Sequence, residues 1–229
     1  MELLVLLPAL LIFLFSLYRL VKDDYIFIRK GISLEQSYDI SFITLWVSLF
    51  FSKLLYVLFH FSNKQNIFVQ FFSIKNGEFS LIGAIIGGVI ALYIFSKYKK
   101  MPLGRMSDFF SLSFLYALPV GLLANAIFVS KNQLLYVFLN VIIYFVVVLF
   151  FVQFLYPKIL NRTIKEGMLS ILFLLFFSTI SLLTSLLSSL KDIQTFLTAQ
   201  NGVTLLLFFF SIFLLIKEHS SSPSRRSLN

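Results

Sequence analysis

The chain has 229 residues, of which 59% are hydrophobic and only 13% are charged, and its mean hydropathy is +0.94. A soluble domain carries about a quarter charged residues, so this composition excludes an ordinary soluble globular protein. The net charge of +9 would suit nucleic-acid binding in a soluble protein. In a membrane protein the same charge belongs to cytoplasmic loops that face anionic lipid, so we expect no nucleic-acid partner.

Apolar runs of about 17–25 residues, the length that crosses a bilayer as an α-helix, recur along the whole chain. No stretch alternates strictly between apolar and polar residues, which favours helices over the strands of an outer-membrane barrel. We therefore predict an all-α, polytopic transmembrane bundle of about seven spans. The predicted spans are residues 3–21, 40–59, 79–96, 109–128, 134–156, 168–190 and the shortest, 202–216.

The two ends of the chain need separate interpretation. The first run could be a cleaved signal peptide, but it opens with Glu2 instead of a basic segment and shows no small-x-small cleavage site before Arg19, so we keep it as a helix. Residues 219–229 are rich in Ser and have nothing to bury, which predicts a disordered cytoplasmic tail. Residues 1–218 are then a single transmembrane domain.

Lys and Arg are distributed unevenly over the connectors between the runs. The second, fourth and sixth connectors hold only Lys64, Lys75, Lys131 and Lys191, and Lys53 lies inside a run. Because cytoplasmic loops carry the excess of positive charge, we predict an N-terminus outside the cytoplasm and a C-terminus inside it. The other three connectors and the tail hold 14 of the 19 basic residues: Arg19, Lys22, Arg29, Lys30, Lys97, Lys99, Lys100, Arg105, Lys158, Arg162, Lys165, Lys217, Arg225 and Arg226.

A few residues could carry chemistry. The chain has no Cys and two His, so we expect no cofactor and no metal site. Lys53 lies within an apolar run, where an ionised side chain costs about 3 kcal/mol on insertion scales. It either faces the bundle interior or snorkels to the outer interface about two turns away. Asp108 opens the fourth run, where an acid stabilises a helix N-terminus.

Glycines mark the start of the third run. Gly83 and Gly87 are four residues apart and share a helix face, with Gly88 beside them. Because glycine has no Cβ atom, a second backbone can approach such a face closely, and the pattern predicts helix packing.

Six short segments follow one another along the chain: Ser52-Lys-Leu-Leu-Tyr-Val-Leu-Phe59, Phe79-Ser-Leu-Ile-Gly-Ala-Ile-Ile-Gly-Gly88, Lys99-Lys-Met-Pro102 with Asp108, Gly121-Leu-Leu-Ala-Asn125, Gln133-Leu-Leu-Tyr136 and Leu197-Thr-Ala-Gln200. In order and spacing they resemble segments of the bacterial prolipoprotein diacylglyceryl transferase family. The first is similar to the family's Ala-Arg-Leu-Gly-Tyr, with Lys53 in place of Arg. The fourth is similar to Gly-Arg-x-Gly-Asn, in which Asn125 is retained.

The resemblance implies a seven-span enzyme of the bacterial plasma membrane that transfers diacylglyceryl from phosphatidylglycerol to a lipoprotein cysteine. Its partners would be a membrane phospholipid, with phosphatidylglycerol expected, and prolipoprotein signal peptides. By the same resemblance the lipid headgroup would be bound by four side chains: Lys53, Tyr56, Asn125 and Gln200.

The chain departs from the family pattern at positions that the reaction needs. The family's His falls on Ile82, the Arg of its fourth span on Leu122, and a further Arg near Ser181. Thioether formation needs a base for the thiol and cations for the departing phosphate. Two interpretations therefore stay open: a divergent transferase, or a non-catalytic lipid-binding or scaffold protein (a pseudoenzyme) with the same fold. A transporter or channel is disfavoured, since Lys53 is the one clear ion within a span.

Overall fold

The computed structural model describes residues 7–60, 71–72, 79–127, 131–161, 163–189 and 198–220. All of the longer elements in these residues are helical, which confirms the all-α prediction. The elements are α1 (Leu7–Lys22), α2 (Tyr25–Arg29), α3 (Leu34–Phe59), α5 (Leu81–Tyr98), α6 (Leu103–Ala126), α7 (Lys131–Phe150), the π-helical turn η2 (Phe151–Leu155), α8 (Tyr156–Leu160), α9 (Met168–Ser188) and α10 (Ala199–Ser220).

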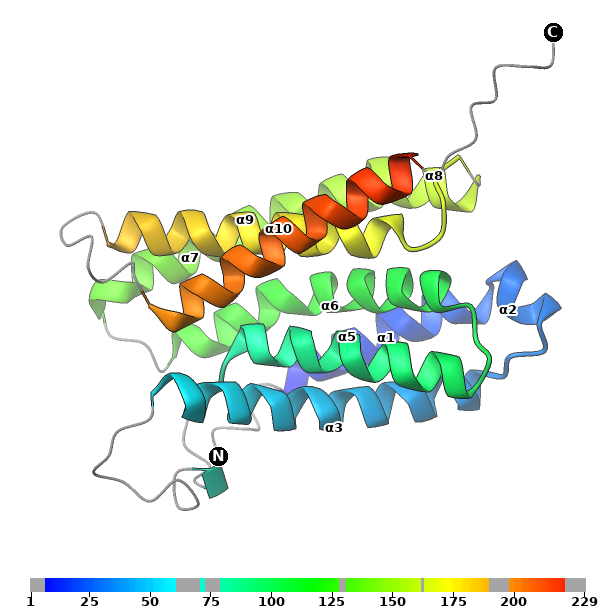
Figure 1. The fold of residues 1–229 in the computed structure, drawn as a ribbon, viewed down its shortest axis with the longest axis horizontal. Coiled ribbons are helices and arrows are strands. Elements are labelled where there is room, and N and C mark those ends of the chain that lie inside the picture. Colours follow the sequence, from blue (N-terminus) through cyan, green and yellow to red (C-terminus); the bar gives the residue numbers. More distant parts are fainter. Residues whose placement is uncertain are drawn as a thin grey trace, which may run out of the picture.

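Helix α6 is the centre of the bundle and contacts α1, α5, α7 and α9. Figure 1 shows the paired helices α3 and α5 on one side of it and the group of α7, α9 and α10 on the other. Two clusters of buried apolar side chains fill the space around α6, one toward α7 and α9 and the other toward α1. The position of α6 therefore determines how the two helix groups face each other.

Six helices in the described residues are long and apolar enough to cross a membrane: α3, α5, α6, the continuous helix over 134–160, α9 and α10. A polytopic helical bundle is thereby confirmed. Helix α1 has 16 described residues, or about 24 Å at ~1.5 Å per residue, against a hydrocarbon core of about 30 Å. The count of seven spans and the orientation of the termini stay predictions.

Several helices extend beyond the apolar runs that predicted them. Helix α3 begins at Leu34 because the Ser33 hydroxyl accepts a hydrogen bond from the Gln36 N–H (3.1 Å) and caps the helix. Helix α6 begins at Leu103, directly after Pro102, and α10 continues to Ser220. Hydropathy marks where a helix lies in hydrocarbon, whereas capping decides where it starts. The predicted tail lies outside the described residues from 221 onward.

A buried ion pair joins α6 to the segment that follows α1. Arg105 donates hydrogen bonds from Nε (3.0 Å) and Nη2 (2.7 Å) to Oδ2 of Asp24. The other carboxylate oxygen of Asp24 accepts from the N–H groups of Ile26 and Phe27 and so caps α2. Arg105 and Asp24 are 5% and 4% exposed, so each balances a charge that water cannot reach.

Asp108 joins α6 to α9. The prediction that it stabilises the N-terminus of its own helix was wrong. The residue lies past the first turn of α6, not at its start, and its side chain points to another helix. Oδ2 accepts from the Gly167 N–H (2.7 Å) and Oδ1 from the Ser170 N–H (2.9 Å). Gly167 has no side chain that could cap α9, and Asp108 satisfies N–H groups that would otherwise lack partners.

We predict that Asp24→Ala lowers the free energy of unfolding by about 3–5 kcal/mol, because the Arg105 guanidinium is then buried without its counter-ion. Unfolding in detergent micelles, followed by circular dichroism, measures the change. The matched control is Glu218→Ala, which removes an exposed ion pair with Lys165 (3.1 Å) and should cost less than about 1 kcal/mol. Equal losses in the two variants would contradict the assigned role of Asp24.

Candidate functional site

Helices α3 and α5 pack closely at the glycines of α5. A Cβ atom on Gly83 would lie 2.6 Å from the carbonyl oxygen of Phe51, and one on Gly87 would lie 2.6 Å from the Phe51 Cβ. At Gly88 a Cβ atom would come within 3.0 Å of the Ser48 hydroxyl. Only hydrogen fits between the two backbones at Gly83 and Gly87, so these positions set the separation of the helices.

Two serines fix the start of α5 against α3. The Ser52 hydroxyl donates to the carbonyl oxygen of Ser80 (2.8 Å), and the Ser80 N–H donates to the carbonyl oxygen of Ser52 (3.1 Å). The Ser80 hydroxyl in turn accepts from the Gly83 N–H (3.3 Å) and caps α5. This contact lies directly beside Lys53 in α3 and Phe79 before α5, and it holds the two residues opposite each other.

Lys53 is buried in the protein and lies between aromatic rings. The residue is 5% exposed, and its Nζ atom lies 5.3 Å from the ring centroid of Phe79 and 5.6 Å from that of Tyr56. Ring faces attract an ammonium group, by about 0.5–2 kcal/mol depending on exposure. The side chain is therefore held inside the bundle wall rather than extended to the outer interface.

Tyr56 extends this site toward the end of α3. It is half-buried, and its ring stacks on His60 with centroids 4.4 Å apart. The His60 Nδ1 atom lies 3.1 Å from the carbonyl oxygen of Tyr56. His60 and Phe79 were not predicted as site residues. The spacing of Lys53, Tyr56 and His60, three and then four residues apart, was a usable signal because it places all three on one helix face.

Asn125 and Gln200 lie at the same end of the bundle as Lys53 but in different surroundings. Figure 1 shows the end of α3, the start of α5, the end of α6 and the start of α10 at this end. Asn125 is the penultimate residue of α6 and Gln200 is the second of α10, and both side chains are exposed. The neighbouring Asn201 donates from Nδ2 to the Ser185 hydroxyl (2.6 Å) and links α10 to α9.

The positions that correspond by resemblance to the family's His and Arg residues are not charged and face the core. Ile82 is 3% exposed and belongs to the apolar cluster around α6. Leu122 is half-buried and packs against the same cluster. Ser181 in α9 is half-buried and interacts with the side chain of Tyr144. None of the three side chains is a general base or a cation at neutral pH.

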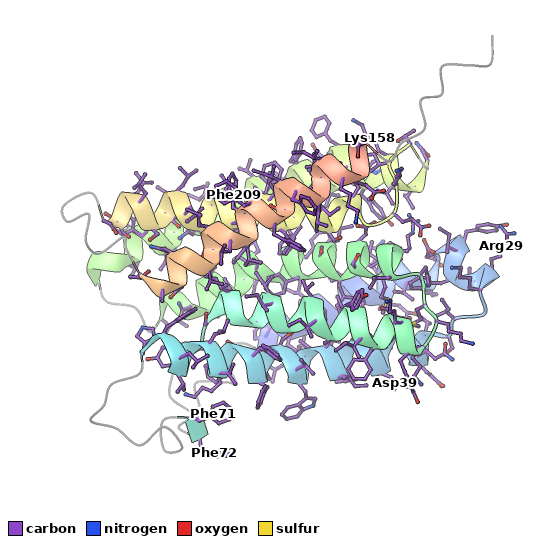
Figure 2. All side chains as sticks on the ribbon, viewed as in Figure 1. Arg29, Asp39, Phe71, Phe72, Lys158 and Phe209 are labelled. Carbon is purple, nitrogen blue, oxygen red and sulfur yellow. The ribbon has the colours of Figure 1, made fainter. Side chains whose placement is uncertain are left out.

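The opposite end of the bundle carries most of the described positive charge. Arg29 and Lys158 lie there, as Figure 2 shows, while Phe71 and Phe72 lie at the Lys53 end. An ion pair between Lys165 and Glu218 joins the segment before α9 to the end of α10 at the charged end. If the predicted orientation holds, this charge difference puts Lys53 in the outer-leaflet half of the bundle.

Comparison with known proteins identifies the same family as the sequence motifs. The sequence model for prolipoprotein diacylglyceryl transferase matches residues 3–133. That range includes Lys53, Ile82, Leu122 and Asn125 and ends before Ser181.

Curated relatives carry the same name. A phosphatidylglycerol–prolipoprotein diacylglyceryl transferase of Clostridium kluyveri is 30% identical over 96 residues, which is 42% of this chain and 38% of the relative. That of Clostridioides difficile is 30% identical over 99 residues, 43% of this chain and 40% of the relative. One from Clostridium botulinum is 38% identical over 71 residues, 29% of this chain and 28% of the relative. The chain thus aligns with less than half of the length of each of these three.

We predict that Gly83→Ala lowers the free energy of unfolding by about 1–3 kcal/mol, because the new methyl group overlaps the backbone of α3. Gly202→Ala is the matched control. A Cβ atom there meets nothing within 4 Å, so the higher helix propensity of Ala should make this change neutral or stabilising by up to about 1 kcal/mol. The measurement is the free energy of unfolding of both variants in the same detergent. A Gly83→Ala protein as stable as the unsubstituted chain would refute the close contact.

Proposed function

Because the chain belongs to the prolipoprotein diacylglyceryl transferase family, we propose that it binds an anionic phospholipid of the outer leaflet, with the phosphate at Lys53, and does not turn it over. The protein is a multi-pass, transferase-like protein of the bacterial plasma membrane. The observation that carries the proposal is the combination of a buried cation at Lys53 with apolar side chains at Ile82 and Leu122.

The position of Lys53 supports lipid binding. An ammonium group held between two rings, near the end of a spanning helix, lies at a depth that a phospholipid headgroup reaches when its chains enter the bundle wall. Lysine binds phosphate as a point charge through up to three donors. The names of the Clostridium relatives specify phosphatidylglycerol, and the phosphate of its headgroup carries oxygens that could accept hydrogen bonds from the Lys53 ammonium.

The loss of ionisable groups supports the absence of turnover. In the family reaction a bond forms between the cysteine sulfur and a glyceryl carbon, the bond from that carbon to the phosphate oxygen breaks, a base takes the thiol proton, and glycerol phosphate leaves. Ile82 and Leu122 can neither accept that proton nor stabilise the departing phosphate. Lys53 alone also lacks the paired, planar donors with which Arg grips a phosphate.

A second candidate, residual transfer, is favoured by one observation. His60 stacks on Tyr56 and lies on the same helix face as Lys53, and a neutral imidazole nitrogen can accept a proton. In this candidate His60 would accept the thiol proton while Lys53 holds the phosphate. His60 is exposed, so a substrate peptide could reach it from the outer side.

We predict that the purified chain retains phosphatidylglycerol and that Lys53→Met lowers this retention about 10- to 100-fold, as expected for the loss of a charge-assisted hydrogen bond. Lipid extraction followed by mass spectrometry counts the retained lipid. Lys53→Arg should keep it, because the positive charge is kept. Lys99→Met, an exposed substitution at the opposite end, is the control, and an equal loss in this variant would rule out a specific site at Lys53.

We further predict that the chain releases no glycerol phosphate from phosphatidylglycerol in the presence of a prolipoprotein peptide, and that it does not restore lipoprotein modification in cells depleted of the transferase. Release that disappears in His60→Ala would overturn this proposal and establish the second candidate. An active transferase from Clostridium kluyveri, assayed in the same membranes, controls for substrate delivery.

A further inference from the structure

A cavity of about 660 Å³ lies at the charged end of the bundle, between α1, α6 and the continuous helix that includes η2 and α8. We call it the α1 groove. Its apolar wall includes Ile12, Phe15 and Val152, and Phe15 is 64% exposed, so the groove opens on the surface that faces lipid. None of its lining residues belongs to α3 or α5, so the groove is separate from the Lys53 site.

The π-helical turn shapes one wall of the groove. Pro157 has no N–H group, and in a regular α-helix its ring would press against the carbonyl group four residues earlier. The wider turn over Phe151–Leu155 accommodates the proline within the span. Val152, Tyr156 and Leu160 then follow at intervals of four residues, and all three line the groove.

The mouth of the groove carries two opposite charges. Arg19 and Asp23 both line it, and both are exposed. Asp24 lines it as well, but Arg105 already balances its charge at 2.7 Å. Tyr116 lies within electrostatic range of Arg19, and Tyr156 within range of Asp23. The mouth therefore offers one cation, one anion and two phenol hydroxyl groups, with a net charge near zero.

In a bilayer, the molecule that fits a groove with an apolar wall and a charged mouth is a phospholipid. From Ile12 to Arg19 the helix rises by about 10 Å, so the apolar wall lies at the depth of acyl chains when the charged mouth lies among the headgroups. We propose that the α1 groove binds one zwitterionic phospholipid of the phosphoethanolamine class from the cytoplasmic leaflet. Arg19 and a tyrosine hydroxyl hold the phosphate, and Asp23 accepts hydrogen bonds from the ammonium group.

Charge complementarity selects this headgroup over an anionic one. A phosphoglycerol headgroup would place its negative charge beside Arg19 but leave Asp23 facing it with no cation to balance. A choline headgroup carries both charges, but its methylated ammonium cannot donate hydrogen bonds to Asp23. The groove should therefore prefer the primary ammonium of phosphoethanolamine to both alternatives.

The test is lipid retention by the full chain carrying Lys53→Met, which removes the proposed outer headgroup site, so that the two proposals can fail separately. Native mass spectrometry counts bound lipid after incubation with equal amounts of phosphatidylethanolamine, phosphatidylglycerol and phosphatidylcholine. We expect one phosphatidylethanolamine, favoured about tenfold over each competitor. Asp23→Asn should remove the preference, and Arg19→Gln should lower retention of all three lipids about tenfold.

Two further variants keep the result interpretable. Lys22→Gln changes an exposed charge between these residues that does not line the groove, and it should change nothing. Ser16→Trp fills the groove without altering its charge and should abolish retention, while circular dichroism shows that the helices remain. Equal retention of phosphatidylglycerol and phosphatidylethanolamine by the Lys53→Met chain, or an unchanged preference when Asp23→Asn is added to it, would overturn the proposal.

Discussion

The packed interior of a protein offers no bulk water to a buried polar group, so such a group needs a partner within the protein, and this constraint organises the whole bundle. Helix α6 satisfies this constraint through two of its residues. Arg105 donates hydrogen bonds to Asp24, and Asp108 accepts them from N–H groups at the start of α9. These two contacts connect α6 to the helices on either side of it through hydrogen bonds that no solvent replaces. The apolar clusters then pack around a central helix whose position is already fixed.

The two ends of the bundle differ in which charged side chains a lipid headgroup could contact. At the charged end the buried charged residues Asp24, Arg105 and Asp108 are paired within the protein, whereas the exposed Arg19 and Asp23 line an open groove. At the other end close packing of α3 on α5 holds Lys53 inside the wall, against two rings. In the proposed account each end thus meets a different leaflet and a different headgroup, and apolar Ile82 and Leu122 stand where, by resemblance, the family has a His and an Arg.

Much of the fold and some of the site could be predicted from the sequence. The runs 79–96 and 168–190 coincide with α5 and α9 to within two residues, because apolar length is what a spanning helix requires. The family resemblance is confirmed by the match over 3–133. The role of Asp108 was missed because its partner lies 59 residues away, and no local pattern reports such a contact. The burial of the predicted headgroup residues could not be read from the sequence either: Lys53 is buried, whereas Asn125 and Gln200 are exposed.

Accessibility of single cysteines in intact cells tests most directly whether the charged end faces the cytoplasm, on which both leaflet assignments depend. The chain has no Cys, so His60→Cys, at the end of α3, and Lys99→Cys, at the end of α5, each report without background. A membrane-impermeant maleimide should label His60→Cys in intact cells and Lys99→Cys only after permeabilisation. Labelling of Lys99→Cys from outside, with His60→Cys protected, would contradict the account.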